Sequence, residues 1–219
     1  MIETVVKLGG SLEATGALPP LLDVLVRAAA EGRRLLAIPG GGRFADAVRA
    51  ACDENDPGAD AAHWAAVLAM DQLAYLMSGW APAASLITDP DAADDVADRG
   101  LLPILAPFAW LRATDSLPHS WDVTADSIAA RLAADLDATR LVLVKAADPE
   151  LVGSLHSRGA GLDVEELALR GIVDVYFPRA LGYDRECWIV NGQEPEQLHR
   201  LLQGDVGGAV RVSHDLTNR

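Results

Sequence analysis

Two lysines stand out among the charged residues, because the other sixteen cationic side chains of the chain are arginines. Lys7 and Lys145 each end a run of apolar residues rich in valine, which is typical of a buried parallel strand. Ligands of open α/β sheets bind outside the carboxyl ends of such strands. An ammonium group there suits phosphate oxygens, on which charge builds during phosphoryl transfer. The alternative is that a lysine stands at a strand end by chance.

Two glycine-rich turns follow predicted strands, and each could bind an anion. Glycine lets backbone N–H groups approach phosphate oxygens, and the N-terminus of a helix adds a partial positive charge. The first turn holds Gly9, Gly10 and Ser11, and the second holds Gly40, Gly41, Gly42 and Arg43. The second turn also matches the dinucleotide-binding pattern G-x-G-x-x-A through Ala45. That pattern requires an acidic residue after a second strand about 20 residues later, where this chain has a polar loop entering a helix.

Acidic and hydroxyl residues precede a predicted helix at Asp122, Thr124 and Asp126. Carboxylates in this position often only cap a helix or complement its dipole. A carboxylate here could instead orient two lysines without itself reacting. A further acidic residue, Asp148, follows the strand that ends at Lys145, where a contact with adenine or ribose would be natural.

The elements that must position these residues alternate between strand-like and helix-like patterns. We expect strands at Thr4–Leu8, Leu35–Ile38, Ser85–Thr88, Leu141–Lys145, Trp188–Val190 and Ala209–Val212, and a strand or hairpin at Leu101–Leu105 and at Trp110–Leu111. We expect helices at Pro20–Glu31, Phe44–Cys52, Ala61–Trp80, Asp91–Asp98, Asp163–Leu169 and Pro195–Leu202, and one capped by Thr124 or Asp122. This order predicts an α/β fold, a three-layer αβα sandwich with a mostly parallel central sheet, in a single domain over residues 1–219.

The composition excludes several classes of protein. Half of the residues are hydrophobic and the formal net charge is −14, which argues against disorder and against binding to nucleic acid. No apolar run has the length of a membrane span and no signal peptide is evident. Cys52 and Cys187 are isolated, so we expect a cytoplasmic protein. The five histidines show no ligand spacing, and we predict no protein-bound metal site.

Taken in order, these segments resemble the amino acid kinase superfamily, which includes acetylglutamate, aspartate, uridylate and isopentenyl phosphate kinases. The opening pattern of that family, K-x-G-G-S, matches residues 7–11, and its second glycine loop matches residues 40–42. Its helix that begins with A-D matches Ala125 and Asp126. Its later strand, which ends in a nucleotide-binding loop, matches residues 145–148.

The resemblance implies an ATP-dependent kinase that uses Mg²⁺, acts on a small phosphate or carboxylate compound and forms a homodimer or a higher homo-oligomer. It implies two catalytic residues: Lys7 stabilises the transferred phosphoryl group, and Asp126 holds the catalytic cations in place. The residues that it places at the nucleotide are Gly9, Gly10, Ser11, Lys145 and Asp148. The residues that it places at the acceptor are Gly40, Gly41, Gly42, Arg43, Asp122 and Thr124.

The chain departs from the family pattern in three places. Asp148 is followed by proline rather than glycine, no lysine follows Lys145, and Ala209 ends the segment that reads G-T in the family. Arg158, Arg179 or Lys145 itself could replace the later lysine. These departures keep open a non-catalytic relative that binds nucleotide or an oxyanion, beside the hypothesis of an NAD(P)-dependent oxidoreductase.

Within the superfamily, two runs resemble the aminomethylfuran phosphate kinases of methanofuran-type cofactor biosynthesis. They are the run D-V-T-x-D-S-I-A, which begins at Asp122, and the run V-D-x-Y-F-P over Val173–Pro178. The resemblance implies that a phosphate monoester is converted to a diphosphate. Trp121 would then lie beside the site, where it could stack on a furan.

Overall fold

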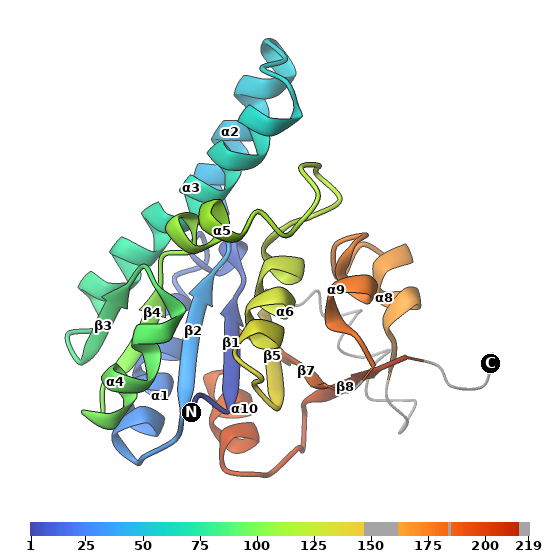
Figure 1. The fold of residues 1–219 in the computed structure, drawn as a ribbon. Coiled ribbons are helices and arrows are strands. Elements are labelled where there is room, and N and C mark those ends of the chain that lie inside the picture. Colours follow the sequence, from blue (N-terminus) through green and yellow to red (C-terminus); the bar gives the residue numbers. More distant parts are fainter. Residues whose placement is uncertain (147–161, 184, 215–219) are drawn as a thin grey trace.

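The computed structural model describes residues 1–146, 162–183 and 185–214, which surround one twisted sheet (Figure 1). Among these residues the sheet has eight strands in the order β3-β4-β2-β1-β5-β7-β8-β6. The antiparallel pair is β7 with β8, and the other paired neighbours are parallel. The strands are β1 (Thr4–Leu8), β2 (Leu35–Pro39), β3 (Ala84–Ile87), β4 (Leu102–Leu105), β5 (Arg140–Lys145), β6 (Leu162–Asp163), β7 (Glu186–Asn191) and β8 (Val210–Ser213).

Helices connect most of these strands and cover both faces of the sheet (Figure 1). They are α1 (Leu18–Ala30), α2 (Gly42–Glu54), α3 (Ala59–Trp80), α4 (Ala93–Asp98), α5 (Phe108–Thr114), α6 (Ala125–Asp135), α8 (Val164–Leu169), α9 (Phe177–Leu181) and α10 (Pro195–Leu202). Two short 3-10 helices are η1 (Gly10–Leu12) and η2 (Pro90–Ala92). This arrangement confirms the predicted α/β fold with a mostly parallel sheet.

Two hydrophobic cores lie on opposite faces of the sheet, because successive residues of a strand point to opposite sides. Val5 of β1 belongs to the core that α6, α8 and α9 cover. Val6, the next residue, belongs to the core that α1 and α10 cover. Both valines are fully buried, so the central strands are apolar on both faces, as their continuous apolar runs predict.

The helices α2 and α3 pack against each other and extend together beyond the edge of the sheet (Figure 1). The chain reverses between them at Gly58, whose φ of 82° lies in the left-handed region that favours glycine. The second glycine turn therefore leads through α2 into another long helix. A dinucleotide-binding unit would instead continue into a strand.

One predicted element is wrong. Trp110 and Leu111 lie in the helix α5, not in a strand or a hairpin. The backbone N–H of Phe108, in the first turn of this helix, donates a hydrogen bond of 3.0 Å to the carboxylate of Asp71 on α3. This partner is 37 residues away in the chain, so the local sequence does not reveal the start of α5.

Candidate active site

Lys7 and Lys145 lie on neighbouring strands and point to the same face of the sheet. In the register of β1 and β5, Lys7 pairs with Leu143. Residues that pair across parallel strands share a face, and Lys145, two residues after Leu143, shares it too. This face also carries Val5 and Leu143, which pack in the core under α6. The two ammonium groups are therefore directed toward α6 at the carboxyl edge of the sheet.

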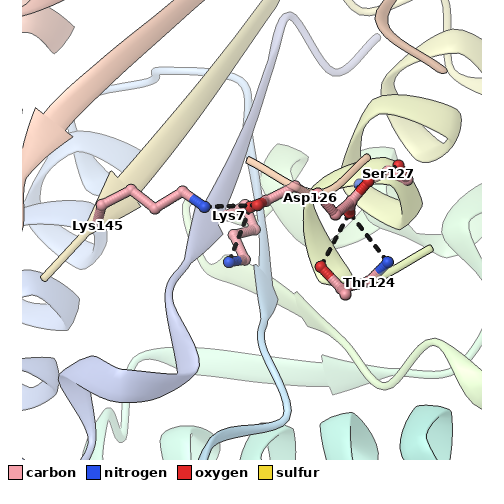
Figure 2. A network of polar contacts seen from close by, with 6 residues as sticks. Lys7, Thr124, Asp126, Ser127 and Lys145 are labelled. Carbon is pink, nitrogen blue, oxygen red and sulfur yellow. Dashed lines mark hydrogen bonds and ion pairs between the residues drawn. The ribbon is translucent and has the colours of Figure 1, made fainter. Parts of the chain in front are cut away.

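Asp126, the second residue of α6, lies between the two ammonium groups (Figure 2). Its Oδ1 atom is 3.0 Å from Nζ of Lys7, and its Oδ2 atom accepts a hydrogen bond of 2.5 Å from Nζ of Lys145. Only 3% of Asp126 and 5% of Lys7 are exposed, so the carboxylate bridges two cations away from bulk water.

The charges of this triad shift the pKa values of its members. Burial alone would raise the pKa of Asp126, but the charges of Lys145 and Lys7 outweigh it and lower that pKa to about 2. Burial lowers the pKa of Lys7, and the carboxylate of Asp126 opposes that effect. With all three groups ionised, the triad carries a net charge of +1. An uncompensated buried charge is costly, and an anionic ligand beside it would remove that cost.

A second carboxylate, that of Asp174, holds the start of α6. Its oxygens accept hydrogen bonds from the backbone N–H and the hydroxyl of Thr124, each at 2.9 Å. They also accept a bond of 3.0 Å from the backbone N–H of Ser127 and one from its hydroxyl. Thr124 is the N-cap residue, but its own side chain forms no capping bond, and Asp174 replaces that cap. Burial raises the pKa of Asp174, in spite of these four donors.

The two glycine turns pack directly against each other. A Cβ atom on Gly10 would lie 2.2 Å from the backbone nitrogen of Gly42, and one on Gly40 would lie 2.6 Å from that of Gly10. Gly42 has a φ of 52°. Gly9 approaches β5 in the same way, with its N–H bonded to the carbonyl of Val144 at 2.8 Å. Glycine is therefore required here for backbone packing, apart from any role toward a ligand.

A cavity of about 290 Å³ opens between the glycine turns, α3 and the segment before α6. Its polar end holds Lys7 and the glycine turns, and its walls are mostly apolar side chains of α3 and α6. At its rim, the guanidinium of Arg49 lies 4.4 Å from the ring centre of Trp121. The lining residues used below are Lys7, Gly10, Asp46, Arg49, His63, Met70, Trp121 and Ile128.

The cavity gathers many of the residues that the sequence singles out, but not all of them. Those that line it are Lys7, Gly10, Ser11, Gly40, Gly41, Gly42, Thr124 and the tryptophan Trp121. Asp126 and Lys145 meet Lys7 behind this lining. Gly9 and Asp122 do not line it, nor does Arg43, which forms an ion pair of 2.6 Å with Glu13. Asp148 and Arg158 lie outside the described residues, and Arg179 lies over the ring of Tyr176.

Sequence reasoning assigned no role to three residues of this site. Asp174 belongs to the run V-D-x-Y-F-P, but its contacts with α6 span 47 to 50 residues of chain. Arg49 and His63 reach the cavity from α2 and α3, which converge on it. No pattern in the sequence marks Arg49 or His63, because α2 and α3 converge on the cavity only in the folded chain.

Comparison with known proteins gives a consistent result. The sequence model of the amino acid kinase family matches residues 3–149, which include both glycine turns and the whole triad. The [5-(aminomethyl)furan-3-yl]methyl phosphate kinase of Methanocaldococcus jannaschii is 30% identical over 207 residues, covering 91% of this chain and 93% of that protein.

Solved structures of uridylate (UMP) kinases share the fold. The enzyme from Bacillus anthracis superposes with a TM-score of 0.69 at 16% identity, covering 97% of this chain and 96% of its own. The enzyme from Ureaplasma parvum gives a TM-score of 0.67 at 14% identity, and the enzyme from Archaeoglobus fulgidus gives 0.62 at 15% identity. Each comparison covers 97% of this chain and 99% of the other chain.

Proposed function

The chain belongs to the amino acid kinase family, and on that premise we propose that it transfers the γ-phosphoryl group of ATP to an aminomethylfuran-methyl phosphate. The product would be the corresponding diphosphate, in the biosynthesis of a methanofuran-type cofactor. That the chain is a phosphotransferase acting on a small molecule follows from its relatives, which are kinases. The choice of acceptor rests on the relative from Methanocaldococcus jannaschii, whose similarity covers nearly the whole of both chains.

The observation that carries the proposal is the buried triad of Lys7, Asp126 and Lys145 next to a cavity with a glycine-lined end. In phosphoryl transfer, charge spreads over the equatorial oxygens of the transferred group, and catalysis is mostly positioning and electrostatic stabilisation. A net charge of +1, fixed at the carboxyl edge of β1 and β5, supplies that stabilisation with little reorganisation.

Asp126 orients the lysines and does not act as a base. Its pKa of about 2 leaves it ionised near neutral pH, and both of its oxygens face ammonium groups. The proposed nucleophile needs no base, because a phosphate monoester has a second pKa of about 6 and its oxygens are already ionised at neutral pH. A phosphate acceptor therefore places no demand for a general base on the site, whereas an alcohol would.

ATP and Mg²⁺ are the cofactors that we propose. Gly10, Gly41 and Gly42 line the cavity without side chains of their own, which fits the close approach of a phosphate chain. Among the described residues no group of three His, Cys, Asp or Glu side chains could hold a metal ion. We therefore assign Mg²⁺ to the phosphate oxygens of the nucleotide and water, where it would neutralise phosphate charge.

The acceptor would lie in the cavity with its phosphate toward Lys7 and its ring among the apolar walls. Met70 and Ile128 supply such walls, and Trp121 offers an aromatic face at the rim. Arg49, held over that ring, places a cation where it could reach the acceptor's phosphate.

The direct test is release of ADP from MgATP with a panel of acceptors. The panel contains aminomethylfuran-methyl phosphate, isopentenyl phosphate, UMP, acetylglutamate and aspartate. We expect turnover that depends on the furan phosphate and is at least about tenfold faster than with any other compound, a difference of about 1.4 kcal/mol. Faster turnover with UMP or with an amino acid would contradict the proposed acceptor. If no compound of the panel causes release of ADP although the chain binds ATP, a non-catalytic relative is favoured.

A further inference from the structure

His63 is a buried polar side chain for which the described part of the structure shows no hydrogen-bond partner. It lies in the first turns of α3, is 7% exposed and lines the cavity next to the triad. It also borders a smaller cavity of about 50 Å³ beside Trp121. Its ring nitrogens are not among the fully buried polar atoms that lack a partner, so they are open to a ligand in the cavity.

The imidazole of His119 packs face to face on that of His63, with ring centres 4.4 Å apart and an angle of 14° between the planes. Each ring nitrogen of His119 faces a carboxylate, Nδ1 that of Asp60 at 2.7 Å and Nε2 that of Asp115 at 2.8 Å. Only the doubly protonated imidazolium can donate to both. These bonds raise the pKa of His119, with that to Asp60 contributing most.

His63 therefore stays neutral beside a charged neighbour. Burial lowers its pKa, the positive charge of His119 lowers it further, and Asp115 and Asp60 oppose that effect. Arg112 on α5 also lies near this cluster, with its guanidinium 4.7 Å from the ring centre of Trp64. Three charged residues of other elements also line this cavity: Asp46 and Arg49 of α2, and Lys7 of β1.

We propose that His63 determines acceptor specificity by accepting a hydrogen bond from the ammonium group of the acceptor, an assignment that rests on the proposed function. A neutral imidazole offers one lone pair, which an ammonium group can use and a methyl group cannot. Behind it, the carboxylates of Asp60 and Asp115 hold the stacked imidazole of His119, which keeps the ring of His63 in place for a ligand in front of it. His119 is a positioning residue, because it fixes the ring plane of His63 and contacts no ligand.

Asp46 is the competing candidate for this contact, since it also lines the cavity and carries a negative charge. It is exposed on α2, so water already solvates its carboxylate. His63 is 7% exposed, so its ring has less water to lose when a ligand binds. A bond to His63 therefore adds more to the discrimination between an ammonium and a methyl group.

The test compares the binding of two phosphate monoesters by isothermal titration calorimetry. One is the aminomethylfuran-methyl phosphate, and the other is its analogue with a methyl group in place of the aminomethyl group. We expect the wild-type chain to bind the amine about tenfold more tightly or better. In His63→Ala this ratio should fall to about twofold or less. His63→Gln, which keeps the volume and an acceptor atom, should retain most of it, and His199→Ala on α10 is the control.

The pH dependence gives a second readout that a merely structural role would not change. The ratio for the wild-type chain should fall as the pH drops through the pKa of His63, which burial holds below its ordinary value of about 6.5, since protonated His63 repels the ammonium. In His63→Gln it should stay constant. The phosphate titrates alike in both compounds and cancels in the ratio.

The outcomes separate this inference from the proposed function. Three results would each overturn the role of His63. They are equal binding of the two compounds by the wild-type chain, an unchanged ratio in His63→Ala, and loss of the ratio in Asp46→Asn alone. Amine-dependent binding that requires His63, without any turnover, would overturn the proposed reaction and leave the binding role intact.

Discussion

The carboxylate of Asp126 connects two lysines that are 138 residues apart in the sequence. The sequence identifies both lysines, because they are rare and each ends a buried run. It also identifies Asp126 as a carboxylate at the start of a helix that could orient cations. The spacing alone does not predict that one carboxylate contacts both ammonium groups, since this depends on how α6 packs on β1 and β5.

Removal of Lys7 and removal of Asp126 should have different effects on stability. We expect Lys7→Ala to lower kcat about a hundredfold or more, because it removes a fixed charge from the transition state. It leaves Asp126 paired with Lys145, so the fold should persist. Asp126→Ala leaves two buried ammonium groups facing each other and should lower the free energy of unfolding by about 3 kcal/mol. Steady-state kinetics and urea denaturation measure both effects, and a loss of less than tenfold in Lys7→Ala would refute its role.

Asp174 should act on catalysis through the position of α6. Asp174→Ala leaves the donors of Thr124 and Ser127 without their acceptor, and we expect it to lower the free energy of unfolding by about 2 kcal/mol. Because Asp126 lies in the first turn of the same helix, kcat should fall as well. Asp205→Ala is the matched control, since its carboxylate accepts a bond from Gly207 far from the site. Equal stability of the two variants would show that the cap is unimportant.

The first turns of two helices near the site, α5 and α6, are bound by carboxylates from distant parts of the sequence. Asp71 on α3 binds the first turn of α5, and Asp174 binds the first turn of α6. Local capping rules therefore fail at both places: Trp110 and Leu111 were assigned to a strand or hairpin, and Thr124 or Asp122 was expected to cap α6. The central strands β1, β2 and β5 were predictable because each is a continuous apolar run that is buried on both faces, whereas the two-residue strand β6 was not predicted.

The contact between the two glycine turns should be sensitive to a single added methyl group. In Gly10→Ala the new Cβ would lie 2.2 Å from the nitrogen of Gly42 and 2.6 Å from its Cα, so the turns must separate. We expect a loss of about 1–3 kcal/mol in stability and a large fall in kcat/KM. Gly79→Ala on α3 is the control, because an added Cβ there meets nothing within 4 Å. Similar activity in both variants would contradict the importance of this packing.

The whole molecule has the predicted layers of helices around a central sheet, and it also has features that the sequence does not predict. The hairpin of α2 and α3 extends beyond the sheet, and no residue of α2 is buried. In the described part of the chain no helix is long and apolar enough to cross a membrane. The convergence of α2, α3 and the segment at Trp121 creates one end of the cavity. Because this depends on the whole arrangement, residues such as His63 could not be assigned from sequence.

We propose that the exposed face of α3 forms a homodimer contact. Leu68, Tyr75, Leu76 and Trp80 are 42%, 63%, 39% and 40% exposed, which is unusual for four large apolar side chains of one helix. Light scattering after size-exclusion chromatography should give the mass of two chains for the wild type. It should give the mass of one chain for a variant with both Leu68→Glu and Tyr75→Glu. Leu169→Glu, on α8, is the control, and a monomeric wild type would refute the contact.

In the proposed function, the chain converts a furan-bearing phosphate monoester to a diphosphate with ATP. Phosphorus NMR of a reaction that contains MgATP and aminomethylfuran-methyl phosphate follows every phosphate at once. We predict that the monoester signal is replaced by two coupled diphosphate signals as ATP becomes ADP, and that Lys7→Ala abolishes this change. An unchanged monoester signal, with ATP either intact or hydrolysed to inorganic phosphate, would contradict the account.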